Sequence, residues 1–169
     1  MSMLTAIDLD NLLTNIDTEI AEAIREALPV DFRDQLSAAA RSSREITESA
    51  AGTEGQEVGA ANVAAWLRLG ALDALVGWLT NACSTCLHSP NPARPQPIWS
   101  AAWKPNLVVC TPCLRLLKVS GVADRLCDCC GTDTLGEGIA TVTVVLGAMV
   151  YQAGACTECQ DEAIKQAAA

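Results

Sequence analysis

Histidine is almost missing from this chain of 169 residues, which contains His88 alone. Aromatic side chains are also scarce, with four tryptophans, one tyrosine and one phenylalanine. Half of the residues are hydrophobic, but alanine supplies much of that share, so few bulky side chains can fill a core. Small domains with a thin core usually need a further source of stability, such as a bound metal ion.

Basic residues are few: 11 lysines and arginines stand against 20 aspartates and glutamates, which gives a formal net charge of −9. Residues 1–80 carry most of this excess, with a net charge of −8. Phosphate backbones repel an acidic chain, so the charge disfavours a general nucleic-acid binder. We expect a protein partner, or a second copy of the chain in a homodimer.

Long apolar stretches are absent as well. The most apolar window, residues 60–80, is interrupted by Asn62, Arg68 and Asp73, which makes it a poor membrane span. The N-terminal residues are acidic and lack the apolar segment of a secretory signal peptide. We therefore expect a cytoplasmic protein with reduced cysteines and no membrane contact.

Cysteine, in contrast, is abundant: eight of the nine cysteines form four CxxC pairs. The first two pairs are separated by 23 residues and the last two by 25, so one unit occurs twice. Zn²⁺ takes four tetrahedral ligands, and thiolates at positions i and i+3 can reach one ion through a tight turn. The spacing predicts two Zn²⁺ ions per chain, held by Cys83, Cys86, Cys110, Cys113, Cys127, Cys130, Cys156 and Cys159.

The sequence allows more than one role for each of two further side chains. Cys129, the ninth cysteine, is expected to be a spare thiol, with ligand replacement or sensitivity to oxidation as alternatives. His88 is expected beside the first site or on the surface, although it could substitute for a cysteine ligand. The repeated unit favours sequential ligation, pair one with two and pair three with four, over a cross-braced scheme.

The first part of the chain has helical periodicity. Apolar residues recur at three- and four-residue steps in residues 4–28, 31–49 and 60–81, and residues 51–58 have the composition of a loop. In the third helix, Leu67 and Trp78 fall opposite the main stripe and are candidates for a partner surface. The stripe itself, expected to face the core, consists of Ala65, Leu69, Leu72, Val76 and Leu79.

These patterns predict an α+β protein. An acidic helical segment of about three helices, residues 1–81, could provide a dimerisation or partner surface. It precedes a tandem zinc-binding module, residues 82–169, with small β-hairpin–helix units at 83–118 and 127–166. Each unit reads as a CxxC turn, a β-hairpin and a second CxxC that opens a helix.

This order of elements resembles the treble-clef zinc finger, and the cysteine spacing is shared by zinc ribbons. The resemblance covers residues 83–166. Some treble-clef proteins are nucleases with several histidines at the metal, and a chain with one histidine does not support that activity. Four-cysteine sites are also closed, whereas catalytic zinc keeps an open position. No other catalytic motif is present, so we expect no enzyme and no catalytic residues.

The sequence leaves two functions to weigh. The first is a zinc-binding protein-interaction or regulatory adaptor, with Trp99 and Trp103 as candidate partner contacts, although both could simply cover the first zinc site. The alternative is a nucleic-acid-binding or transcription-regulatory zinc finger that uses a local basic patch. Its candidate contacts are Arg94, Lys104, Arg115, Lys118 and Arg125.

Overall fold

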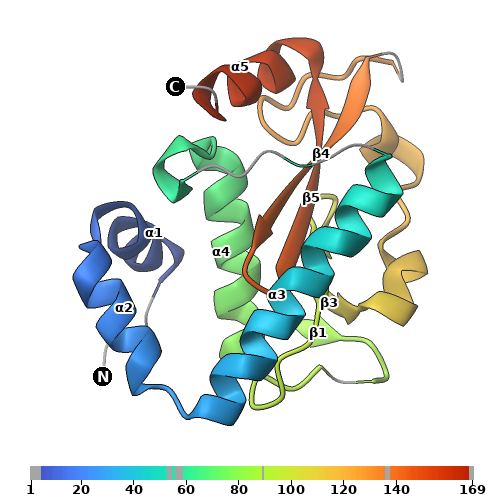
Figure 1. Ribbon diagram of the computed structural model, residues 1–169. Coiled ribbons are helices and arrows are strands. Elements are labelled where there is room, and N and C mark those ends of the chain that lie inside the picture. The colour runs from blue at the N-terminus through green and yellow to red at the C-terminus, as the bar shows by residue number, and fades with distance from the viewer. Residues whose placement is uncertain (1–4, 53–54, 56–58, 89, 136–137, 168–169) are drawn as a thin grey trace.

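The computed structural model, which describes residues 5–52, 55, 59–88, 90–135 and 138–167, has a five-stranded sheet at its centre (Figure 1). The strand order is β1-β3-β2-β5-β4, and helices lie on both faces, so the expected α+β class is confirmed. The strands are β1 (Ser84–Thr85), β2 (Ile98–Ala101), β3 (Lys104–Cys110), β4 (Ile139–Leu146) and β5 (Met149–Cys156).

The two predicted hairpins are fused into this one sheet. β2 pairs antiparallel with β3 and β4 with β5, as expected, but β2 and β5 also pair, in parallel, with Ile98 opposite Met149. One strand of each unit therefore pairs with one strand of the other, and the two hairpins form a single sheet. β1 adds a short parallel edge strand beside β3.

Helices divide the N-terminal part more finely than the sequence predicted. The single helix expected at 4–28 is two helices, because the chain is extended at Ile16 and Asp17, and the Asp17 carboxylate caps the second by accepting from the Glu19 N–H at 2.8 Å. The other two predicted helices are present. The elements are α1 (Ala6–Asn15), α2 (Thr18–Ala27), α3 (Val30–Ala51), η1 (Ala60–Asn62), α4 (Ala65–Leu79), η2 (Thr111–Leu117), η3 (Gly121–Asp124) and α5 (Thr157–Ala167).

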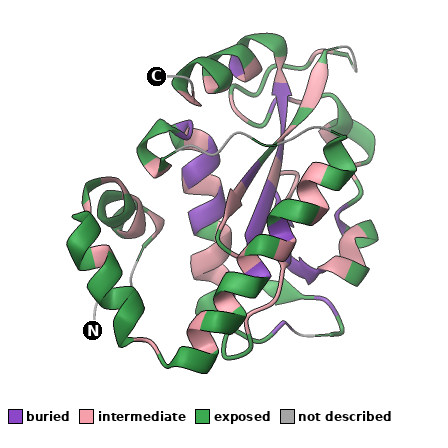
Figure 2. Cartoon of the chain, in the orientation of Figure 1, coloured by how far each residue is buried: buried purple, intermediate pink, exposed green. Residues whose placement is uncertain are grey.

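The sheet is the middle of three layers, with α4 on one face and α3 on the other. Alternate residues of each strand face opposite sides. Thus Val144 packs with Leu67 of α4, whereas Val145 lies against the cluster that includes Ile46 of α3. Figure 2 shows the buried residues gathered on the strands and on the adjoining side of α4.

The buried side of α4 differs from the predicted stripe. Leu67 and Trp78, expected on a partner surface, are buried against the sheet, and the Trp78 Nε1–H donates to the Pro90 carbonyl at 3.1 Å. Leu79, expected in the core, is exposed. Apolar residues occupy nearly every side of this helix, so its periodicity could not identify the side that meets the sheet.

Close contacts hold both helices on the sheet. Gly70 of α4 leaves no room for a side chain, because a Cβ there would collide with the Tyr151 hydroxyl. On the opposite face, the buried Ser43 hydroxyl of α3 donates to the Ala148 carbonyl, in the turn between β4 and β5, at 3.0 Å. The hydrophobic core clusters also contain side chains from both sides of the predicted boundary at residue 81.

Arg68, the buried charged residue among those described, attaches α1 to α4. Its guanidinium pairs with both carboxylate oxygens of Asp10, one of them at 3.1 Å, and donates to the carbonyls of Ala60 and Val63. The hydrogen bond from Arg68 lowers the pKa of Asp10. None of the described helices is both long and apolar enough to span a bilayer.

We predict that Asp10→Ala lowers the free energy of unfolding at pH 7 by about 1–3 kcal/mol, because it leaves a buried guanidinium short of partners. The folded-state pKa of Asp10 is lowered, so its contribution is present above the unfolded pKa of about 3.9 and is lost as pH falls through the folded value. Urea denaturation should show the difference at pH 7 and much less of it near pH 2. Glu22→Ala, on exposed α2, is the control; equal effects of the two substitutions at pH 7 would contradict this role.

Candidate metal centres

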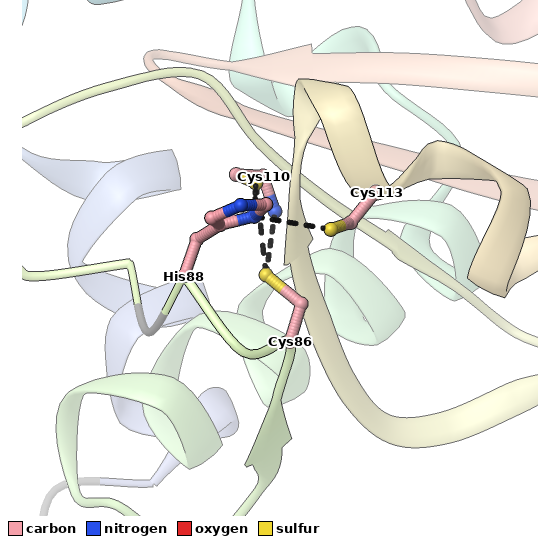
Figure 3. A group of neighbouring side chains, drawn as sticks. All are labelled: Cys86, His88, Cys110 and Cys113. Carbon is pink, nitrogen blue, oxygen red and sulfur yellow. Dashed lines mark hydrogen bonds between the residues drawn. The ribbon is translucent and has the colours of Figure 1, made fainter.

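The first candidate metal centre joins three cysteines and the one histidine. Potential ligand atoms of Cys86, His88, Cys110 and Cys113 all lie within 4.8 Å of one another (Figure 3). The Cys86 and Cys110 sulfurs are 3.6 Å apart, and His88 Nδ1 lies 3.3 Å from the Cys110 sulfur and 3.2 Å from the Cys113 sulfur. Two sulfurs on one tetrahedral zinc ion are about 3.8 Å apart, so this spacing fits a shared metal.

Three segments bring these side chains together. Cys86 directly follows β1, and Cys110 ends β3. Cys113 lies in η2, which begins immediately after β3. Pairing of β1 with β3 places Cys86 beside Cys110, and the Cys110 backbone N–H donates to the Cys86 sulfur at 3.5 Å. A turn after Cys86 then carries His88 over the other three (Figure 3).

Cys83, predicted as a ligand, is outside this group, and His88 stands in it instead. The physical reason is β1: Ser84 and Thr85 are extended, and side chains three residues apart on an extended chain point to opposite sides. Cys83 packs near Trp78 and Ile98, where burial raises the pKa of its thiol. The CxxC spacing suggested a turn here, but strand pairing separates its two cysteines. The useful sequence feature was the histidine two residues after Cys86.

The second candidate centre has the four cysteines that the spacing predicted. The sulfurs of Cys127, Cys130, Cys156 and Cys159 lie within 4.8 Å of one another, with Cys130 and Cys156 3.9 Å apart. Both groups join consecutive parts of the chain, so the structure has the sequential arrangement and not the cross-braced one.

Local backbone geometry forms the second centre. Cys127 and Cys130 flank a tight turn that ends at Gly131, whose φ of +74° suits glycine and whose N–H donates to the Cys127 carbonyl at 2.8 Å. Cys156 ends β5, and Cys159 lies in the first turn of α5. Helix N-termini stabilise thiolates through free N–H groups and the helix dipole.

The thiol pKa values differ within each centre. Hydrogen bonds with the side chain and the backbone of Thr132 lower the pKa of Cys130 to about 6. Burial and then the neighbouring Cys129 raise the pKa of Cys159. In the first centre, burial and then the Cys86 sulfur raise the pKa of Cys110 to about 11. Burial acts in the same direction on Cys86, but hydrogen bonds from the N–H groups of Cys110 and His88, together with those of the Cys110 and Cys113 side chains, lower its pKa. Crowded thiols oppose one another's ionisation, and a bound cation would relieve that opposition.

The two centres lie at opposite ends of the sheet. Cys110 is opposite Ile98, which is opposite Met149 at the start of β5, whereas Cys156 is at the end of β5. Cys156 is seven positions after Met149, which is about 23 Å along an extended strand. Each centre therefore ties a different end of the sheet to the segments that follow it.

Cys129 is partly buried next to the second centre, outside its group of four, and burial raises its pKa. Trp99 is buried in the core, which removes it as a partner contact, and its Nε1–H donates to Thr111 at 3.1 Å. Trp103 is half-buried beside it and donates to the Leu117 carbonyl at 2.6 Å.

The candidate nucleic-acid contacts are divided by their surroundings. Lys104 Nζ donates to the Leu116 carbonyl at 2.6 Å, and Arg125 pairs with Asp133 at 3.2 Å. Arg94, Arg115 and Lys118 are exposed. Two of the five proposed basic contacts thus have partners within the chain.

Comparison of the chain with protein-family models, curated proteins and solved structures found no match. The metal centres therefore rest on their own geometry: two groups of four thiol or imidazole side chains, each able to hold a metal ion. Tetrahedral sets of thiolate and imidazole side chains are among those that bind zinc in structural sites.

We predict that His88→Ala weakens zinc binding at the first centre at least about 100-fold, because it removes one of four ligands. Cys83→Ser should leave both zinc affinities within about threefold, since its side chain lies outside the group. Competition with a chromophoric chelator measures both variants. The opposite ranking, with Cys83→Ser the weaker binder, would show that Cys83 and not His88 completes the site.

Proposed function

We propose that this chain is a non-catalytic zinc-binding protein whose two Zn²⁺ ions hold a rigid platform for protein–protein interaction. The observation that carries the proposal is the pair of four-ligand centres at opposite ends of one sheet. Four protein ligands saturate tetrahedral zinc and leave no position for a substrate, as in structural sites. In the second unit, a cysteine turn, a hairpin and a cysteine-bearing helix follow in the treble-clef order, which supports that resemblance.

The hollow beside Asp73 and Tyr151 is too small for an ordinary ligand, whereas a larger groove of about 670 Å³ runs along β4. Between α4 and β3, a hollow of about 70 Å³ is lined by small and apolar side chains with Asp73 and Tyr151. It is far smaller than the roughly 300–1,000 Å³ of ordinary ligand pockets. Burial raises the Tyr151 pKa to about 12, so its hydroxyl stays protonated at neutral pH. The role that fits this chain best is to present surfaces to other proteins.

A structural role for zinc predicts that its removal destabilises the fold. Excess EDTA together with phenanthroline should lower the melting temperature by more than about 10 °C, because metal binding and folding are coupled. Circular dichroism should show the transition, and added Zn²⁺ should restore it. An unchanged melting temperature after verified loss of metal would contradict the structural role.

We also predict no binding to duplex or single-stranded DNA or RNA at about 20 mM salt, because the chain is strongly acidic and Lys104 and Arg125 have internal partners. Fluorescence anisotropy with labelled oligonucleotides measures this directly. Binding that falls steeply with salt, and that the double variant Arg115→Ala/Lys118→Ala abolishes, would instead favour the nucleic-acid-binding alternative.

A further inference from the structure

β4 is an edge strand whose outer side pairs with no other strand in the described part of the chain. It is the last strand in the sheet order, and among the described residues its backbone hydrogen bonds go to β5. The turn between them has two residues, so its flanking residues Leu146 and Met149 form a hydrogen-bonded pair. Pairs alternate along an antiparallel ladder, and therefore Thr141, Thr143 and Val145 direct their N–H and C=O groups away from β5.

The sequence of β4 lacks the devices that usually protect such an edge. Its eight residues, IATVTVVL, include no charge, proline or glycine. Natural edge strands are commonly short, charged, interrupted by proline, or covered. The opposite edge, β1, follows this rule, since it has two polar residues. β4 therefore lies at an edge of the sheet but has the composition of a central strand.

A groove of about 670 Å³ runs along β4. Six consecutive residues, 142–147, line it, as expected when a groove follows a strand's backbone edge and not one face. Val63, Ala64 and Leu67 contribute an apolar wall. The wall from α3 is largely polar, with Ala40, Arg44, Thr47 and Glu48, and Gln160, Ala163 and Ile164 of α5 also border the groove. Figure 1 shows β4 between α4 and α3, which pack on opposite faces of the sheet.

We propose that this groove binds an extended peptide segment of a partner protein, which adds to β4 as a sixth strand. This inference deepens the proposed function, since it names the binding site and the chemistry of the partner. Alternate side chains of the added strand would pack against the α4 wall and the α3 wall, as those of β4 do. The partner segment is thus about six residues long and apolar at the alternate positions that would face Val63, Ala64 and Leu67.

The geometry favours a peptide over a second copy of β4. In a symmetric dimer each β4 would have to reach the other, and each is recessed between its own α3 and α4. A peptide strand without flanking helices meets no such obstruction. The apolar wall of Val63, Ala64 and Leu67 offers it buried area, and the outer backbone edge of β4 offers it hydrogen bonds.

The test uses a fluorescein-labelled peptide of alternating valine and threonine with a lysine at each end, titrated with the full zinc-loaded chain. Saturable binding by fluorescence anisotropy is expected. A matched peptide with every second backbone nitrogen methylated keeps the side chains but loses the donors along one side. Two such peptides are compared, each methylated along a different edge of the strand. The peptide whose methylated edge is the one that faces β4 should bind at least about tenfold more weakly.

Variants of the chain locate the site. Thr143→Pro removes one outward N–H in an edge strand that can accept proline, and Thr143→Ala is the matched control that keeps it. We expect about tenfold weaker binding for the first and little change for the second, with both zinc ions retained. Bound peptide should also slow hydrogen exchange at the Thr141, Thr143 and Val145 amides.

Two results would overturn the proposal. Absent binding, or binding unaffected by both methylation patterns and by Thr143→Pro, would exclude strand addition at β4. A dimer that Thr143→Pro dissociates would identify a second copy as the occupant. Neither result would contradict the proposed function, a zinc-stabilised platform for protein interaction. That function would be contradicted by salt-dependent nucleic-acid binding or by a fold that does not depend on zinc.

Discussion

Parallel pairing of β2 with β5 is the contact on which the rest of this structure depends. It converts two hairpins, each too small to bury much by itself, into one sheet with two covered faces. The same pairing fixes where everything else lies. Because Ile98 is opposite Met149, Cys110 is at one end of the sheet and Cys156 at the other, and β1 and β4 become the edges.

The metal centres complement this sheet. The core has few large side chains, and α1 and α2 contribute no buried residues. Each centre ties the end of one hairpin to the segment that precedes it and the helical turn that follows it. A zinc ion at each end would therefore tie the sheet to its neighbouring segments, and metal binding would add directly to folding free energy.

The second unit could be predicted from sequence because its determinants are local. Alternation in Thr141–Leu146, a glycine turn and cysteines at a helix start all act within about 30 residues, and the structure has each of them. The first centre was less predictable. Whether Cys83 or His88 joins it depends on β1 pairing with β3, a contact between distant parts of the chain.

The same distinction explains the other differences. Asp17 ends one helical run locally, but the long apolar periodicity concealed that break. α4 is apolar on most sides, so only its contact with the sheet shows that Leu67 and Trp78 face inward. Trp99 resembled an interface anchor by residue type, and the fold uses it as core. Residue type predicted the chemistry of the chain; strand pairing decided which residues carry it.

The most direct test is native mass spectrometry of the purified protein, repeated under denaturing conditions. The account predicts two zinc ions per chain in the native spectrum, all lost on denaturation, with nine free thiols in the unfolded chain. A protein without metal, with a mass lowered by about two hydrogens for each oxidised thiol pair, would contradict it. The cysteines would then be disulfides, and neither metal centre would exist.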